Sequence, residues 1–343
     1  MTLELLHAVV EGLSLTEQQA ETAMGALLAG ESTPVLTAAF LTALHIKGET
    51  VDELTGFARA MRAAAVPLDI GPEFRPLLDT CGTGGNRTSA FNISTVAAFV
   101  VAGAGVRVAK HGNRSLASKC GSADVLEALG VNTRIEPAVV KRTIEEAGIG
   151  FVFAPTFHGA TRHVQPIRAE LKIRSAFNFL GPLTNPAGAE MQVAGTWSDE
   201  AAAKIAGALA RLGLQRGYVV HGSDGLGELT LTGSSTVFSV AAGLVERRTL
   251  SPENFGFTPQ SLEGIRGGDI VQNEAIARSV LGGDRGPARD IVLMNAALAL
   301  HTAHAEWSLT EAVERGAESI DSGAAASKLN RLREITIEVL REG

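Results

Sequence analysis

From residue 74 onward, short apolar runs alternate with longer stretches of helical periodicity. The apolar runs are residues 76–79, 106–109, 151–154, 193–197 and 217–221. Helical spacing fills the intervals between them, at residues 94–104, 123–129, 138–147 and 200–212. Apolar runs this short, separated by helices, are typical of buried parallel strands in βα units. The sequence therefore predicts a large α/β domain with a mostly parallel central sheet.

Residues 1 to about 66 have helical periodicity throughout. Thr16 with Gln19, and Thr50 with Glu53, have the spacing of capping boxes, and Pro34 suits the first position of a helix. The sequence predicts a small all-helical domain over residues 1–72. We expect residues 166–188 to join it, and the α/β domain to consist of residues 73–165 and 189–343.

Two segments depart from the βα alternation. Residues 163–186 are rich in Pro and Arg, and we expect them to return to the helical domain. Residues 237–257 have alternating apolar residues and then Ser251-Pro252, a helix-start pattern. The chain is predicted to end in a helical cluster over residues 290–304, a helix opened by a Ser308/Glu311 capping box, and residues 324–341.

Charge and cysteine content exclude several classes of protein. Thirty Lys and Arg against 37 Asp and Glu give a net charge of −7, which disfavours nucleic acid or an anionic membrane as a partner. Cys81 and Cys120 lack metal-ligand spacing and are expected to be reduced, buried packing residues. The N-terminus lacks a signal-peptide pattern, and the longest apolar run, 96–106, is too short to span a membrane. We expect a cytoplasmic protein.

An anion site is predicted between Asp79 and Asp124. No acidic residue lies between these two aspartates, whereas five basic ones do: Arg87, Arg107, Lys110, Arg114 and Lys119. A Cys81–Gly85 string rich in glycine follows the first apolar run, and Ser94 lies where a helix should begin. Glycine turns, hydroxyls and a helix N-terminus suit a phosphate group. Taken without the basic residues, the glycines could instead form a tight turn that binds no ligand.

Other common catalytic patterns are missing from the sequence. The dinucleotide pattern G-x-G-x-x-G fails at Arg87, and no P-loop, H-E-x-x-H or G-x-S-x-G string occurs. His111 is either a general base or a hydrogen-bonding residue of a glycine-rich turn. We expect no covalent nucleophile.

Five strings, in order along the chain, resemble the anthranilate phosphoribosyltransferase family. They are Asp79–Gly85, Phe91–Thr95, Lys110–Arg114, Arg174–Pro186 and His221–Gly225, and the C-terminal Asn295-Ala296-Ala297 agrees. The resemblance implies a homodimer formed through the helical domain, with the active site between the two domains. It also implies transfer of phosphoribose from 5-phosphoribosyl 1-pyrophosphate to the amine of anthranilate, a step of tryptophan biosynthesis, with Mg²⁺ as cofactor.

The resemblance also assigns site residues position by position. Those implied for phosphoribosyl pyrophosphate are Gly82, Gly85, Asn86, Asn92, Ser94, Thr95, Lys110, Asn113, Ser118 and Ser122. Ser94 and Glu228 are implied as Mg²⁺ ligands. Those implied for anthranilate are Gly82, His111, Asn113, His158 and Arg168.

The chemistry of the reaction favours these residue types. Loss of pyrophosphate builds negative charge on the leaving group, which a metal ion, a lysine and backbone N–H groups stabilise. An aromatic amine is neutral at pH 7 and attacks without a strong base. A carboxylate is bound bidentately by arginine. By its place in the motif, Arg168 is the preferred partner of the anthranilate carboxylate. Arg162 and Arg174 are the alternatives. The non-functional interpretation of Arg168 is a surface or interdomain ion pair.

The chain departs from the family pattern at three positions. It has Asn86 and Gly227 where the family usually has Asp, and Ala90 where the family has a hydroxyl residue. Two fewer carboxylates weaken the case for a second Mg²⁺, since hard oxygen ligands hold that ion. Asp224 is a substitute only if its loop shifts.

Two other functions remain open at this point. One is a related phosphoribosyl or pentosyl transferase with another acceptor. The other is a non-catalytic relative that binds nucleic acid, to which the missing acid at Gly227 points. Retention of Lys110, Asn113, Ser94 and Glu228 argues against this second alternative, as does the negative net charge.

Overall fold

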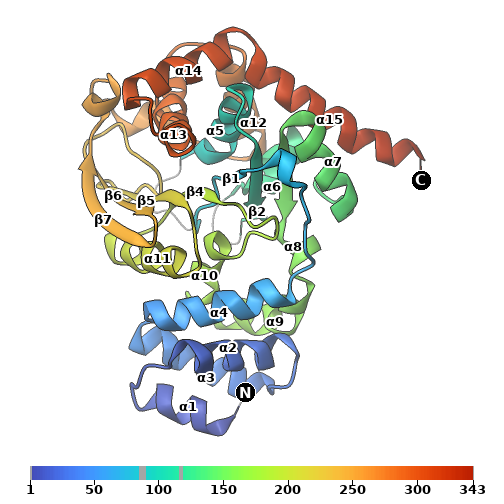
Figure 1. Cartoon of the computed structure of the whole chain (residues 1–343), viewed down its shortest axis with the longest axis vertical. Coiled ribbons are helices and arrows are strands. Elements are labelled where there is room, and N and C mark those ends of the chain that lie inside the picture. The colour runs from blue at the N-terminus through green and yellow to red at the C-terminus, as the bar shows by residue number, and fades with distance from the viewer. Residues whose placement is uncertain (1, 85–89, 116–118, 343) are drawn as a thin grey trace.

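The computed structural model describes residues 2–84, 90–115 and 119–342, with side chains described to residue 338. The molecule is elongated, with the N-terminal helices at one end and a sheet flanked by helices at the other (Figure 1). Three residues predicted to bind phosphoribosyl pyrophosphate, Gly85, Asn86 and Ser118, lie outside the described residues, as does Arg87.

Four helices form the N-terminal end, as predicted. They are α1 (Leu3–Val10), α2 (Glu17–Leu28), α3 (Pro34–Lys47) and α4 (Val51–Ala64). Both capping boxes are present, at Thr16 with Gln19 and at Thr50 with Glu53, and Pro34 is the first residue of α3. The end signals in the sequence therefore placed these helices correctly.

A buried ion pair joins three parts of the helical end. The Glu53 carboxylate lies 2.9 Å from Lys47 Nζ, and both side chains are buried. It also accepts hydrogen bonds from the backbone N–H of Leu15 at 2.9 Å and of Thr50 at 2.8 Å. With one donor on Oε1 and two on Oε2, this carboxylate fixes the start of α4 against α3 and the α1–α2 loop.

The central sheet has seven strands in the order β3-β2-β1-β4-β5-β6-β7. They are β1 (Leu78–Asp79), β2 (Val108–Gly112), β3 (Ile149–Phe153), β4 (Met191–Gly195), β5 (Arg216–Gly222), β6 (Ser235–Ala241) and β7 (Leu244–Leu250). Strands β1 to β5 pair in parallel with one another, whereas the pairs β5–β6 and β6–β7 are antiparallel. The mostly parallel sheet is confirmed.

Residues 237–257 depart from the βα alternation, as expected, and a short 3₁₀ helix over Pro252–Phe255 follows Ser251. Most of them form a hairpin, β6 and β7, that extends the sheet beyond β5. Ala242 and Gly243 connect the strands with φ of 50° and 77°. Two consecutive positive φ values define the hairpin turn whose twist matches that of its strands. The alternating apolar residues were the sign of this half-exposed ribbon.

Strand β2 extends further than the sequence predicts. Its register with β3 continues through Lys110, His111 and Gly112, which pair with Phe151, Val152 and Phe153. The two functional candidates Lys110 and His111 therefore lie in a strand and not in a loop after it. Adjacent strand residues point to opposite faces, so these two side chains serve different sides of the sheet.

Helices cover both faces of the sheet. On one side lie α5 (Ile93–Gly103), α12 (Ile270–Leu281), α13 (Pro287–Ala303) and α14 (Leu309–Asp321), and on the other lies α11 (Asp199–Arg211), next to α4 (Figure 1). Near the β3 edge are α6 (Ser122–Ala128), α7 (Pro137–Ala147) and α15 (Ala324–Glu342). The predicted C-terminal helical cluster is confirmed.

The segment between β3 and β4 contributes to the helical end. It contains α8 (Ala154–Phe157), α9 (Gln165–Leu171) and α10 (Phe177–Leu180). Val164, Phe177 and Leu183 belong to the same buried apolar cluster as the N-terminal helices, and that cluster continues to α11 and to Val219 of β5. Among the described residues, no helix is both long and apolar enough to cross a membrane.

Candidate active site

The carboxyl ends of β1, β4 and β5 meet the N-terminus of α5 around one cavity. It is lined by Thr80, Gly82, Ser94, Ala97, Val193, Gly195, Val220, Gly227, Glu228 and Asn295. In open α/β sheets, ligands bind at the carboxyl ends of the strands, where the connections that follow two neighbouring strands run to opposite faces of the sheet. The cavity therefore lies where the fold most readily accommodates a substrate.

Close backbone approach around the cavity requires glycine. A Cβ atom on Gly195 would lie 1.4 Å from the carbonyl oxygen of Gly227, and one on Gly82 would lie 2.8 Å from the carbonyl oxygen of Gly195. The Thr83 backbone N–H donates to the same Gly195 carbonyl at 2.9 Å. The glycine string thus packs directly on β4 and leaves room for a ligand over the backbone.

Ser94 and Lys110 are connected through Thr80. The Thr80 hydroxyl donates to the Ser94 carbonyl at 3.1 Å, and Lys110 Nζ donates to the Thr80 hydroxyl at 3.1 Å. Lys110 is buried, and burial lowers the pKa of its ammonium group. Lys110 lies on the Ser94 side of the sheet, although its side chain lines an adjoining space together with Thr95 rather than the cavity itself.

Glu228 and Ser94 line the cavity together. A carboxylate and a hydroxyl are oxygen donors of the kind that Mg²⁺ prefers, so the residues present fit that ion. Asp224 lies outside this lining: its carboxylate accepts from the Leu226 N–H at 3.0 Å and from the hydroxyls of Thr230 and Thr232. Those bonds hold Asp224 in its own turn, so it does not replace the acid missing at Gly227.

Asn92, Asn113 and Ser122 do not line the cavity but lie around the N-termini of α5 and α6. Asn92 donates to the Cys120 carbonyl at 3.2 Å and accepts from Asn273 of α12 at 3.2 Å. Ser122, at the start of α6, donates to the Asn113 carbonyl at 3.1 Å. These bonds bring the α5 N-terminus, the α6 N-terminus and the segment after β2 together.

Two basic residues of the acid-free stretch are engaged elsewhere. Arg114 forms ion pairs with Asp124 and with Glu127, the latter at 2.6 Å. Arg107 lies over the Phe74 ring, 5.1 Å from its centroid. Counting basic residues therefore overstated the charge available to an anion, because the balancing carboxylates follow immediately in α6.

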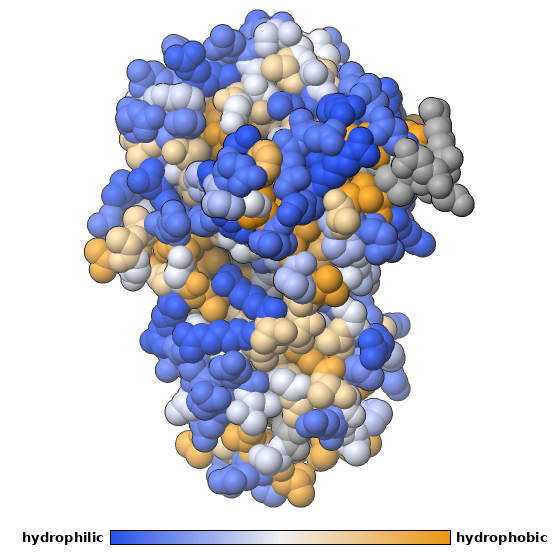
Figure 2. Space-filling view, turned by 45° about the vertical axis from the view of Figure 1, so that its right-hand side comes forward, coloured by the Kyte–Doolittle hydropathy of each residue, from blue (hydrophilic) through white to orange (hydrophobic). Residues whose placement is uncertain are grey.

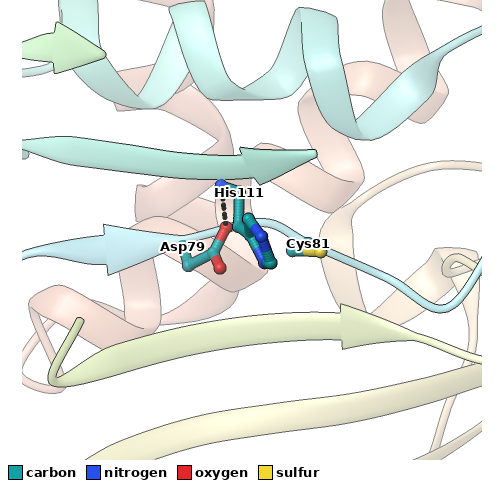
Figure 3. A group of neighbouring side chains, drawn as sticks. All are labelled: Asp79, Cys81 and His111. Atoms are coloured by element: carbon teal, nitrogen blue, oxygen red, sulfur yellow. Dashed lines mark hydrogen bonds between the residues drawn. The ribbon is translucent and has the colours of Figure 1, made fainter. Parts of the chain in front are cut away.

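On the opposite face of β1 and β2 lie Asp79, Cys81 and His111 (Figure 3). The His111 backbone N–H donates to Asp79 Oδ1 at 3.0 Å, and Asn185 Nδ2 donates to Asp79 Oδ2 at 2.8 Å. Burial raises the pKa of Asp79 to about 6, although Lys110 and these hydrogen bonds lower it. Asp79 thus joins β1, β2 and the segment that follows α10.

Two buried imidazoles adjoin one another next to this cluster. The rings of His111 and His158 lie 5.2 Å apart, and His111 Nδ1 is 2.9 Å from the Gly181 carbonyl. Burial, and next the neighbouring His158, lowers the pKa of His111 to about 3. Burial lowers the pKa of His158 to about 4. Both rings are neutral, and Nε2 of each is buried without a hydrogen-bond partner among the described residues.

The arginine candidates differ in their surroundings. The Arg168 guanidinium lies 4.9 Å from the Phe177 ring centroid and donates to Gln165 Oε1 at 3.3 Å. Among the described residues it has no carboxylate partner, so the ion-pair interpretation finds no support. Burial lowers the pKa of Arg168. Arg174 lies over Trp197, and Arg162 is exposed.

Sequence reasoning missed the residues that hold this framework. Asn185 Nδ2 donates to Asp79 and also to the Ala109 carbonyl at 2.8 Å. Asn295 accepts from the Leu229 N–H at 3.0 Å and donates to the Leu229 carbonyl, next to Glu228. Both asparagines stand in family-like strings, which was the available signal.

Comparisons with known proteins agree with this architecture. The helical bundle domain of the glycosyl transferase family matches residues 3–65, and its a/b domain matches residues 75–326. The anthranilate phosphoribosyltransferase of Solibacter usitatus is 55% identical over 327 residues, covering 95% of this chain and 96% of that one. That of Moorella thermoacetica is 54% identical with the same coverage.

Solved structures are similar over nearly the whole chain. Anthranilate phosphoribosyltransferase from Thermus thermophilus aligns with a TM-score of 0.91 at 46% identity, covering 97% of this chain and 99% of that one. The Saccharomyces cerevisiae enzyme in complex with PRPP and Mg aligns with a TM-score of 0.88 at 26% identity, covering 98% and 99%.

A helical bundle joined to an α/β domain with a glycine-lined cavity defines the glycosyl transferase family. Within it, the chain belongs to the anthranilate phosphoribosyltransferases.

Proposed function

We propose that this chain transfers the phosphoribosyl group of 5-phosphoribosyl 1-pyrophosphate to the amine of anthranilate. The products are N-(5-phosphoribosyl)anthranilate, pyrophosphate and a proton. The observation that carries the proposal is the cavity in which Gly82, Ser94 and Glu228 converge, in a chain 55% identical over nearly its full length to a protein of this name. This is a phosphoribosyl transfer step of tryptophan biosynthesis.

The cavity suits the donor substrate. We infer that its phosphates lie over the glycine string and the N-terminus of α5, where backbone N–H groups and the helix dipole favour an anion. Lys110, through Thr80, adds a positive charge behind this surface. Asn92, Thr95, Asn113 and Ser122, together with Gly85, Asn86 and Ser118 outside the described residues, complete the proposed donor site.

The reaction needs electrostatic stabilisation more than a nucleophilic side chain. Mg²⁺ held by Ser94 and Glu228 would supply charge neutralisation on the departing pyrophosphate. The protein holds the sugar so that the neutral amine of the acceptor attacks the anomeric carbon as the pyrophosphate leaves. Buried Lys110 keeps positive charge near the leaving group without reaching water.

The proposed acceptor site lies on the His111 side of β2. His111 and His158 are neutral, and each Nε2 is available to accept a hydrogen bond from a bound acceptor. An aromatic amine donates N–H groups, so two acceptor nitrogens match it. Arg168 supplies the partner for the carboxylate, and Gly82 and Asn113 border both substrates.

The metal content follows from the acids present. Ser94 and Glu228 are described at the cavity, and Gly227 contributes no side chain. We propose one well-held Mg²⁺ and a weak or missing second one.

The assembly proposed is a homodimer through the helical domain, residues 1–72 with 166–188. Large apolar side chains are exposed on this domain: Leu3, Val10, Leu13, Val35 and Ile46. Val35 and Ile46 of α3 are 76% and 79% exposed. A second copy would bury these residues, which a monomer leaves in water. The α/β domain, residues 73–165 and 189–343, carries the donor site.

We propose that the protein works in the cytoplasm. Its two cysteines, Cys81 and Cys120, are buried and form no disulfide among the described residues. Reduced thiols of this kind are usual in reducing compartments.

The alternative with a different acceptor is tested with the same donor. The protein is incubated with phosphoribosyl pyrophosphate, Mg²⁺ and, separately, anthranilate, a purine base or a pyrimidine base. Released pyrophosphate is the common readout. Release with anthranilate alone supports the proposal, whereas release with a nucleobase supports the alternative. The nucleic-acid-binding alternative requires retention of DNA or RNA in a gel-shift assay at physiological salt.

A further inference from the structure

We propose that Asp79, Cys81 and His111 form a binding site for a zinc-type divalent ion, separate from the magnesium site. Each offers one ligand atom, and these three atoms lie within 4.8 Å of one another (Figure 3). All three side chains are buried. A carboxylate, a thiolate and an imidazole are the donor types that zinc prefers, whereas magnesium takes oxygen donors.

The geometry needs only small side-chain movements. Tetrahedral zinc with bonds of about 2.0–2.3 Å places neighbouring ligand atoms about 3.5 Å apart. The present separations, at most 4.8 Å, exceed this by no more than about 1.3 Å. Rotation of the side chains therefore closes the site around an ion.

The surroundings already orient the ligands. His111 Nδ1 lies 2.9 Å from the Gly181 carbonyl, so it donates its proton there and leaves the unpartnered Nε2 as the free ligand. Asp79 is held by the His111 N–H and by Asn185. Metal-bound histidines and carboxylates usually have such outer hydrogen bonds, which fix their orientation.

Charge balance favours a divalent ion here. When the ion binds, the Cys81 thiol loses its proton to solvent, and the weak bond from its sulfur to the Gly82 carbonyl is replaced by a metal–sulfur bond. One thiolate and one carboxylate then neutralise the two positive charges of the ion, with His111 neutral.

The site has a consequence that rests on the proposed function. An ion on His111 Nε2 occupies the nitrogen that we assign to the acceptor amine. Zinc should therefore inhibit the transfer by competing with anthranilate, and added magnesium should not relieve the inhibition because it does not replace zinc on a thiolate.

Cobalt(II) tests the site directly, and the two cysteines provide a matched pair. Protein freed of metal by chelation is titrated with Co²⁺. The expected result is a near-ultraviolet thiolate-to-cobalt charge-transfer band that saturates at one ion per chain and disappears on addition of Zn²⁺. Cys81→Ala and the closer isostere Cys81→Ser should lose the band and bind Co²⁺ at least ~100-fold more weakly. Cys120→Ala should keep both properties.

No band in the wild type, a band that persists in folded Cys81→Ser, or a band lost in Cys120→Ala would overturn the proposal. Circular dichroism establishes that each variant is folded. Zinc that binds without raising the KM for anthranilate would refute the competition. Failure of the transferase proposal would appear differently, as no pyrophosphate release in chelated buffer containing excess Mg²⁺.

Discussion

Replacing Arg168 by alanine tests how the acceptor carboxylate is bound. The guanidinium lies over Phe177 and donates to Gln165, and among the described residues no carboxylate competes for it. A charge-assisted hydrogen bond to a carboxylate contributes about 1.5–3 kcal/mol, and each ~1.4 kcal/mol is a factor of ten in affinity. Arg168→Ala should therefore raise the KM for anthranilate by roughly 10- to 150-fold.

The KM for phosphoribosyl pyrophosphate should change little in Arg168→Ala, because the site that we propose for the donor lies at the other face of β2. Initial rates are measured with each substrate varied in turn. Arg162→Ala is the matched control: it removes an exposed arginine from the same segment, and this arginine donates to the Gly159 carbonyl at 3.5 Å. Arg168→Lys should give an intermediate KM, since lysine keeps the charge but not the fork of donors.

A thermal unfolding scan must first show that Arg168→Ala is as stable as the wild type. A folded Arg168→Ala enzyme with unchanged anthranilate kinetics would remove this residue from the site. Arg174, which lies over Trp197, would then be the next residue to replace.

Three further outcomes are expected. Gly227→Asp should lower the Mg²⁺ concentration for half-maximal rate by roughly tenfold, about 1.4 kcal/mol for an added carboxylate; an unchanged magnesium titration would contradict our account of this position. Glu53→Ala should destabilise the protein to urea by about 3–5 kcal/mol, because it leaves a buried lysine unpaired; a loss below about 1 kcal/mol would show that the pair contributes little. Acid should also destabilise the protein: His111 and His158, with pKa values lowered to about 3 and 4, stay neutral when folded but gain protons when unfolded below pH about 6.5. Asp79, with its pKa raised to about 6, gains a proton in the folded state over the same range and so offsets one of the two histidine protons. The unfolded state then binds one proton more than the folded state between pH about 6 and 4. The free energy of unfolding should therefore fall by about 1.4 kcal/mol for each pH unit lost in this range. Urea unfolding at several pH values measures this slope. In His158→Asn one histidine proton is removed, so the slope should approach zero. A slope in His158→Asn equal to that of the wild type would contradict this account of the acid effect.

Part of the cavity lining could be predicted because the fold is a regular one. Parallel strands end at the same edge of the sheet, so Gly82, Ser94 and Glu228 meet there although they are far apart in sequence. Lys110 was placed on the correct side but in a loop, because the short apolar run ended at residue 109 while the pairing with β3 continued. Hydrogen-bonded pairing is not visible in a count of apolar residues.

Contacts between distant residues were beyond the sequence. Arg114 belonged to an acid-free stretch, yet its partners Asp124 and Glu127 lie one helix further on. Cys81 and His111 have no metal-ligand spacing, and only the register of β1 with β2 brings them together beside Asp79. The hairpin of β6 and β7 was likewise not predicted. The alternating apolar residues in 237–257 indicated a departure from the βα pattern, but not that they form two edge strands of the same sheet.

The central claim is the identity of the reaction, and the fluorescence of anthranilate measures it most directly. Purified protein is mixed with anthranilate, phosphoribosyl pyrophosphate and Mg²⁺, and the loss of fluorescence is compared with the pyrophosphate released. Our account predicts a fluorescence loss that requires both the donor and Mg²⁺, with one pyrophosphate formed for each anthranilate consumed. Fluorescence that stays constant at saturating substrates, with the protein folded and Mg²⁺ present, would contradict it.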